Sequence, residues 1–125
     1  MLGVTCLNVR TLGDHNFDFD YAIDIFAEYM RTNKIEILFL SETHCKDEMD
    51  TTYYTAYGSY RVITSGITES HRQGVAFIVS KNISERITTV SRCRDEPGRL
   101  LALTVRLTSA VTKRIVGVYA PSVGN

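Results

Sequence analysis

The first forty residues show a hydrophobic pattern that predicts a strand, a helix and a second strand. Residues 2–9 form a short, mostly apolar run that ends at a polar corner, as buried strands do. A helix is predicted over residues 20–34, and a second buried strand over residues 35–40 leads into Ser41 and Glu42. The helix has apolar residues at helical spacing: Ala22, Ile25, Phe26, Tyr29 and Met30. A strand, a helix and a strand in this order imply a right-handed crossover and a parallel strand pair.

The pattern changes after this unit. Residues 43–59 are polar and rich in Tyr and Thr, which predicts a loop with at most one helical turn. Short β-rich runs then follow at residues 60–65, 74–80, 86–91, 100–107 and 114–119. Turn-forming residues separate these runs and no helical pattern intervenes, so we expect antiparallel hairpins. The predicted fold class is α/β, with one βαβ unit leading into a mostly antiparallel sheet, and residues 1–125 form one domain.

The composition is that of a globular protein, with 44% hydrophobic and 22% charged residues, and it excludes a disordered chain. The longest uncharged apolar run, residues 37–40, is far shorter than the roughly 20 residues that cross a bilayer. No basic segment followed by an apolar stretch opens the chain, so no signal peptide is expected. We therefore expect an intracellular protein, nuclear or cytoplasmic, with no membrane partner.

The zero net charge conceals two halves of opposite sign. Residues 1–60 hold four Lys or Arg and ten Asp or Glu, whereas residues 61–125 hold ten and four. Ten of the fourteen basic residues are Arg, whose planar side chain suits phosphate well. The asymmetry fits a cation site beside a phosphate-binding surface. It fits equally a helix with a solvated acidic face and arginines on exposed strands.

The three cysteines, Cys6, Cys45 and Cys93, are an odd number without a C-x-x-C pair, which disfavours a disulfide framework and a zinc ribbon. His44 and Cys45 beside Glu42 could be a metal cluster or a Cys/His nucleophile, but no second cluster completes either site.

Two polar residues follow the predicted parallel strands. Asn8 and Glu42 lie at the carboxyl ends of these strands, where open α/β sheets bind ligands. Their oxygens suit Mg²⁺ or Mn²⁺ better than zinc. The alternative is that Asn8 bonds to its own turn and Glu42 caps a surface loop.

Four segments in the same order resemble the endonuclease/exonuclease/phosphatase superfamily, closest to the endonuclease domains of non-LTR retrotransposons. They are LNVRTL at residues 7–12, ILFLSETH at 37–44, GVAFIVS at 74–80 and VGVYAP at 116–121. The resemblance implies that Glu42 binds the essential divalent cation and that Asn8 lies beside the metal and the phosphate. It also implies that Tyr119 contacts the scissile phosphate and that His44 offers a phosphate contact. The implied reaction is metal-dependent phosphodiester hydrolysis on DNA or a related substrate.

The family fold is a four-layer α/β sandwich of roughly twice this length, so the resemblance implies that the chain is its N-terminal half. The Ser-Asp-His motif of the family's second half does not occur in this sequence. We therefore expect the chain alone to be inactive, and its partner to be the missing C-terminal half or a second copy of itself. The alternatives are a non-catalytic relic or interaction module that binds nucleic acid or protein through the Arg-rich half, and an unrelated α/β binding domain.

Overall fold

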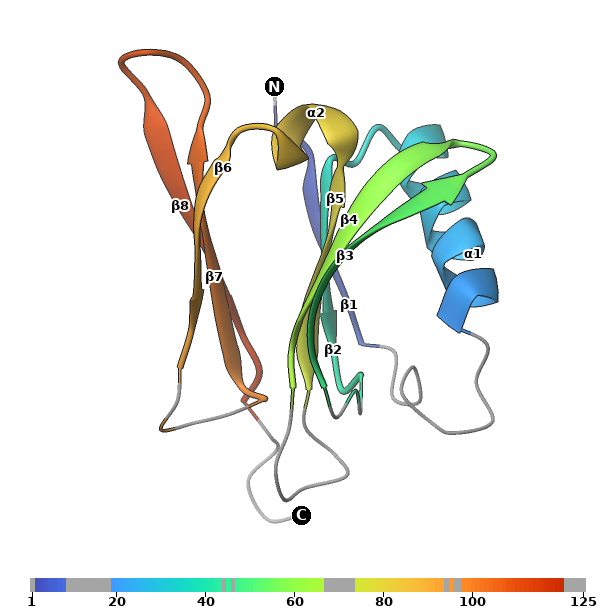
Figure 1. Ribbon diagram of the computed structural model, residues 1–125, viewed down its shortest axis with the longest axis horizontal. Coiled ribbons are helices and arrows are strands. Elements are labelled where there is room, and N and C mark those ends of the chain that lie inside the picture. Colours follow the sequence, from blue (N-terminus) through green and yellow to red (C-terminus); the bar gives the residue numbers. More distant parts are fainter. Residues whose placement is uncertain are drawn as a thin grey trace.

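The computed structural model describes residues 2–8, 19–43, 45, 47–66, 74–93, 95 and 98–120. In these residues the longer of two helices, a five-stranded sheet and a three-stranded sheet form three successive layers (Figure 1). The fold is therefore α/β, with one mixed and one antiparallel sheet.

The five-stranded sheet contains the predicted βαβ unit. Strand β1 (Val4–Asn8) pairs in parallel with β2 (Ile37–Ser41), and helix α1 (Phe19–Thr32) connects them. The sheet continues through β5 (Val75–Ser80) and β4 (Gly58–Ser65), and every further pairing is antiparallel. The parallel pair and the antiparallel neighbours confirm the prediction from the sequence.

Helix α1 covers one face of this sheet, but with a different set of residues from the one predicted. Ala22 and Met30 are buried as expected, whereas Ile25 and Tyr29 are exposed. The buried face also includes Ile23 and Ala27, and the two alanines allow a close approach to the sheet. The helix ends in a Schellman-type turn, in which Lys34 has a φ of +56° and the Ile35 N–H donates to the Met30 carbonyl at 2.8 Å.

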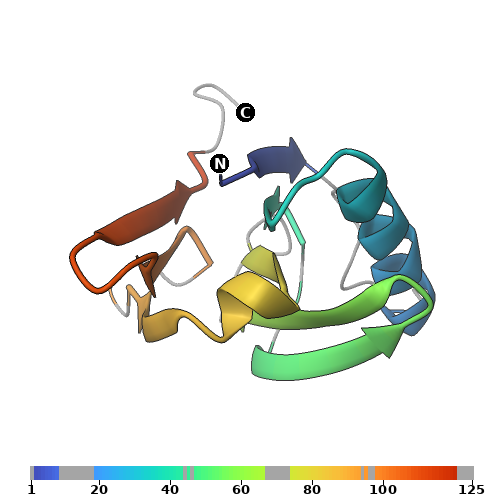
Figure 2. The same ribbon diagram turned by 90° about the horizontal axis from the view of Figure 1, so that it is seen from above.

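The opposite face of the five-stranded sheet packs against the second sheet, as Figure 2 shows from above. This sheet is an antiparallel meander of β6 (Ile87–Arg92), β7 (Leu100–Arg106) and β8 (Thr112–Val118). The core between the sheets contains Ile37, Phe39, Ile63, Val75, Phe77, Val79, Leu101, Leu103 and Val105, with Ile83 from the short helix α2 (Lys81–Ser84) at its margin.

The structure corrects three expectations. The strands after residue 60 form two packed sheets instead of one, because their apolar faces meet each other. The sequence also predicts that the single helix leaves one apolar sheet face uncovered, at Val75, Phe77, Val79, Leu101, Leu103, Val105, Val116 and Val118. The first six are buried between the two sheets, and of this set only Val116 and Val118 are exposed. Part of the predicted loop at residues 43–59 is strand β3 (Glu48–Thr55), which pairs with β4. Its Tyr- and Thr-rich composition favours strands, and Met49 and Tyr53 pack against the core under α1.

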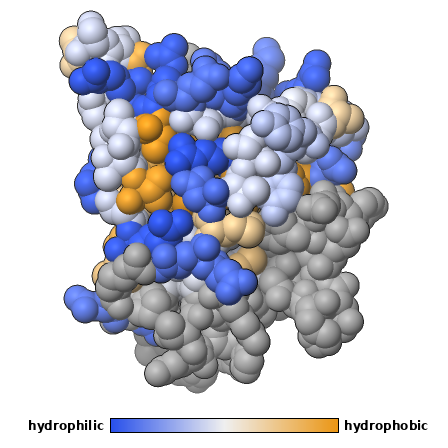
Figure 3. All heavy atoms as spheres, viewed as in Figure 1, coloured by the Kyte–Doolittle hydropathy of each residue, from blue (hydrophilic) through white to orange (hydrophobic). Residues whose placement is uncertain are grey.

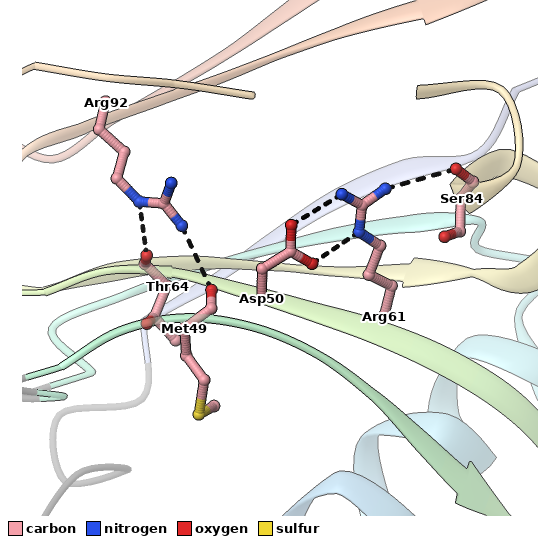
Figure 4. Close-up of polar contacts among 6 residues, drawn as sticks. All are labelled: Met49, Asp50, Arg61, Thr64, Ser84 and Arg92. Carbon is pink, nitrogen blue, oxygen red and sulfur yellow. Dashed lines mark hydrogen bonds and ion pairs between the residues drawn. The ribbon is translucent and has the colours of Figure 1, made fainter. Parts of the chain in front are cut away.

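Two arginines make polar contacts at β3 and β4 (Figure 4). Arg92 of β6 donates from Nε to the Thr64 carbonyl at 3.1 Å and from Nη2 to the Met49 carbonyl at 3.3 Å, so it joins the two sheets. Arg61 forms a two-point ion pair with Asp50, in which both hydrogen bonds are 2.7 Å long. The face that carries these strands is mostly hydrophilic in its described part, with apolar residues showing between the polar ones (Figure 3). No helix in the described residues is long and apolar enough to span a membrane.

Candidate functional site

Glu42 follows directly after the buried strand β2, and its backbone adopts an unusual conformation. Its φ is +55°, in the left-handed region that residues other than glycine seldom occupy. Such a conformation costs of the order of 1 kcal/mol and persists only where the surrounding structure holds it. Here the next residue, Thr43, is fully buried and its N–H donates to the Gly74 carbonyl at 3.0 Å. The half-buried Glu42 side chain is thus fixed at the carboxyl end of β2.

Tyr119 reaches Glu42 from the other sheet. It follows β8, and its N–H donates to the Arg99 carbonyl at 2.8 Å, which extends the pairing with the start of β7. Its hydroxyl donates to Oε1 of Glu42 at 2.9 Å. A hydrogen bond to a charged acceptor in a half-buried place contributes about 1.5–3 kcal/mol. The contact therefore links the two sheets and orients the carboxylate.

Two glycines complete the backbone support of this contact. Gly74 has a φ of +113° and Gly98 a φ of +81°, both in the region that favours glycine. The Gly74 N–H donates to the Gly98 carbonyl at 2.9 Å, while the Gly74 carbonyl accepts from Thr43. The ends of β2 and β8 and the segments before β5 and β7 are thereby joined by hydrogen bonds at one end of the molecule.

The other two predicted site residues are only partly placed. The backbone of Asn8 lies beside Ser41 in the parallel pair, so Asn8 and Glu42 share the same end of the sheet. The side chain of Asn8 and the whole of His44 lie outside the described residues. The structure thus brings Glu42 and Tyr119 into contact and places the backbone of Asn8 next to the residue before Glu42.

The Cys45 thiol, a candidate nucleophile or metal ligand by sequence, is in an unfavourable environment for ionisation. Burial raises the pKa of this thiol, and the nearby Asp47 carboxylate raises it further, although a hydrogen bond with Thr43 partly lowers it. A protonated thiol is a poor nucleophile and a poor metal ligand. The site is therefore better suited to the chemistry of Glu42 than to that of Cys45.

Glu42 is suited to a hard cation held weakly. Among the described residues, no three His, Cys, Asp or Glu side chains lie close enough together to hold a metal ion. Mg²⁺, however, commonly binds through one or two carboxylates and keeps water and substrate phosphate as its other ligands. One half-buried carboxylate at the end of β2 fits that mode, and it does not fit a closed structural metal site.

Gly74, Gly98 and Arg99 support the contact through their backbone atoms, and no sequence pattern marks them as site residues. In the sequence, Pro97 and Gly98 indicate only a turn. Which N–H group the Gly98 carbonyl accepts from depends on how the strands pair, and the sequence does not give that pairing.

Neither a protein-family model nor a curated protein sequence matches this chain.

Proposed function

We propose that this chain supplies the metal-binding side of a site for divalent-cation-dependent phosphodiester hydrolysis, with DNA or a related phosphodiester as substrate. The proposal rests on one observation, the 2.9 Å hydrogen bond from Tyr119 to Glu42 at the end of the parallel strand pair. The family resemblance assigns these two residues from separate sequence segments to one site, and their contact supports that assignment. We further propose that the chain corresponds to half of a four-layer α/β sandwich.

The residues of this chain would act mainly by positioning. Glu42 would hold Mg²⁺ or Mn²⁺ through a carboxylate oxygen, and the Tyr119 hydroxyl would keep that carboxylate in place and border the phosphate. Asn8 would add a neutral hydrogen-bonding group at the same sheet end. When bound, the cation stabilises the negative charge that develops on the phosphate. Rigid strand ends suit this task, because the scaffold restricts the side chains while the loops leave room for substrate.

Hydrolysis also needs groups that orient the water and protonate the leaving oxygen. The described residues hold no group of three or more His, Cys, Asp or Glu side chains that could combine a cation site with such groups. Each missing electrostatic group of this kind costs about 10²–10³ in rate. We therefore propose that residues 1–125 bind the cation and the phosphodiester but do not cleave it by themselves.

The proposal is tested by the anisotropy of a fluorescent DNA duplex titrated with the protein, with and without Mg²⁺. Mg²⁺ should strengthen binding, because the cation bridges carboxylate and phosphate. Glu42→Gln should remove this Mg²⁺-dependent increase in DNA affinity. Asp47→Asn is the control, because Asp47 is an exposed acid directly before β3, and this variant should keep the increase. Binding that is indifferent to Mg²⁺, or an increase that survives in Glu42→Gln, would contradict the proposed site. Plasmid nicking by the chain alone that is lost in Glu42→Ala would show that no further groups are needed.

A second candidate function is nucleic-acid binding without catalysis. Arg106, Lys113 and Arg114 are exposed at the far end of the second sheet, and no ion pair neutralises them among the described residues. Such cations bind phosphate backbones with an affinity that falls steeply with salt. DNA binding that needs no divalent cation and weakens in Arg106→Gln would favour this function over hydrolysis.

A further inference from the structure

In the part of the chain that the structure describes, two strand edges on the same side of the molecule have no strand paired to them. Strand β1 is an edge of the five-stranded sheet and β8 is an edge of the three-stranded sheet. Seen from above, both strands lie along the same side (Figure 2). Edge strands present unpaired N–H and carbonyl groups and therefore favour pairing with another strand.

The two edges are offset, so that part of β1 has none of the described strands above it. Strand β8 lies over β2, since a Cβ atom at Gly117 would collide with the Phe39 ring. The residues of β1 that share the inter-sheet face are Val4 and Cys6, which pair with the buried Ile37 and Phe39. Val4 is nevertheless 46% exposed, and Cys6 is exposed as well. The apolar core between the sheets thus extends to an uncovered strip on β1.

We propose that a second copy of this chain covers this strip, and that each copy's β8 pairs with the other copy's β1. A two-fold axis that runs along the strands, between β1 and its counterpart, produces both pairings at once. β1 and β2 are parallel, and the contact between Glu42 and Tyr119 shows that β2 and β8 end at the same end of the molecule. The new pairings are therefore parallel, and the two candidate sites lie at the same end of the dimer.

The charge distribution favours a second copy as the occupant. In the proposed dimer, the three-stranded sheet of one copy and the five-stranded sheet of the other form one continuous sheet. The acidic helix α1 of the other copy then lies on the outer face of this continuous sheet. The acids Asp24 and Glu28 are exposed on α1, and the cations Arg106 and Arg114 are exposed on β7 and β8. The acidic half of one copy thus meets the basic half of the other, a complementarity that favours self-association in one orientation.

The proposed axis makes a specific prediction for Cys6. Because the axis passes between β1 and its counterpart, the two Cys6 side chains face each other across the inter-sheet space. Packed sheets lie ~10 Å apart, so the two backbones are too distant for an unstrained disulfide but within reach of a short bis-maleimide.

The first experiment measures molar mass by light scattering over a range of concentrations of residues 1–125. We expect a reversible dimer. Val4→Lys should raise the dissociation constant about 100-fold, because two like charges would be buried together at the axis. Val111→Lys is the matched control, since this valine is similarly exposed, at 40%, but lies in the turn between β7 and β8. A chain that stays monomeric, that forms open-ended assemblies, or whose dimer is unaffected by Val4→Lys would contradict the proposal.

The second experiment cross-links the Cys45→Ser/Cys93→Ser variant with a short bis-maleimide, so that only Cys6 can react. A covalent dimer should form at protein concentrations at which light scattering shows a dimer, and Cys6→Ser should abolish it. A dimer in solution that does not cross-link through Cys6 would show that a different surface associates. Neither experiment depends on cation or DNA binding, so either proposal can fail without the other.

Discussion

The hydroxyl of Tyr119 donates a hydrogen bond to Oε1 of Glu42 at 2.9 Å, although 77 residues separate the two in the chain. One residue follows a strand of the first sheet and the other follows a strand of the second. Their contact therefore depends on how the two sheets pack, and the candidate site and the core between the sheets should respond together to mutation.

Tyr119→Phe removes the hydroxyl and keeps the aromatic ring in place. The Glu42 carboxylate loses a donor in a half-buried position, so the free energy of unfolding should fall by about 1.5–3 kcal/mol. Urea denaturation followed by circular dichroism measures the change. Tyr54→Phe is the control, because this tyrosine is 86% exposed and should show almost no effect. Equal effects of the two substitutions would contradict a structural role for the hydrogen bond.

Gly117→Ala tests the close contact between β8 and β2. The added methyl group would collide with the Phe39 ring, so we expect a loss of about 1–3 kcal/mol in the free energy of unfolding. In the double variant with Phe39→Leu the smaller side chain leaves room for the methyl group. The double variant should be more stable than the sum of the single effects predicts, by about 1 kcal/mol. Strict additivity in thermal or urea denaturation would contradict the proposed collision.

The sequence predicted most strands of the chain better than it predicted how the strands pack into sheets. Alternating and continuous apolar runs predicted β1, β2 and the later strands, because burial imposes those patterns locally. The division into two sheets could not be predicted in the same way, since Val75 and Leu103 have the same apolar pattern whether they pack on a helix or on a sheet. Strand β3 was missed because all its positions are exposed or half-buried and most of its side chains are polar, so no apolar run marks it.

The same limit applies to the candidate site. Glu42 and Asn8 could be placed together because parallel strands bring their carboxyl ends to one edge. The contact of Glu42 with Tyr119 depends on the stacking of β8 over β2, which no local pattern encodes. The family resemblance had named both residues but not the hydrogen bond between them.

The ion pair between Asp50 and Arg61 should make stability depend on pH. The hydrogen bonds from Arg61 lower the pKa of Asp50 in the folded state, and burial opposes this only in part. The pair therefore stabilises the fold above the pKa of an unfolded aspartate, ~3.9, and this stabilisation is lost as the pH falls through the lowered value. Because the Asp50 side chain is 40% exposed, the contribution at neutral pH should be only about 0.5 kcal/mol.

Urea denaturation at pH 7 and at pH 3 measures this contribution. Asp50→Asn should destabilise the protein at pH 7 and reduce the difference in stability between the two pH values. Glu85→Gln, an exposed acid just after α2, is the matched control for a lost carboxylate and should reduce that difference less. The same pH dependence in Asp50→Asn as in the unmodified chain would show that the ion pair contributes nothing.

The central claim is that the end of the sheets at Glu42 and Tyr119 holds a divalent cation, and site-resolved NMR with Mn²⁺ tests it most directly. Paramagnetic Mn²⁺ broadens the amide signals nearest to the place where it binds. We predict that the signals of Ser41, Thr43 and Tyr119 broaden first, and that Glu42→Gln removes this selective broadening. Broadening centred instead on the exposed acids Glu48 and Asp50, or an unchanged pattern in Glu42→Gln, would contradict the claim.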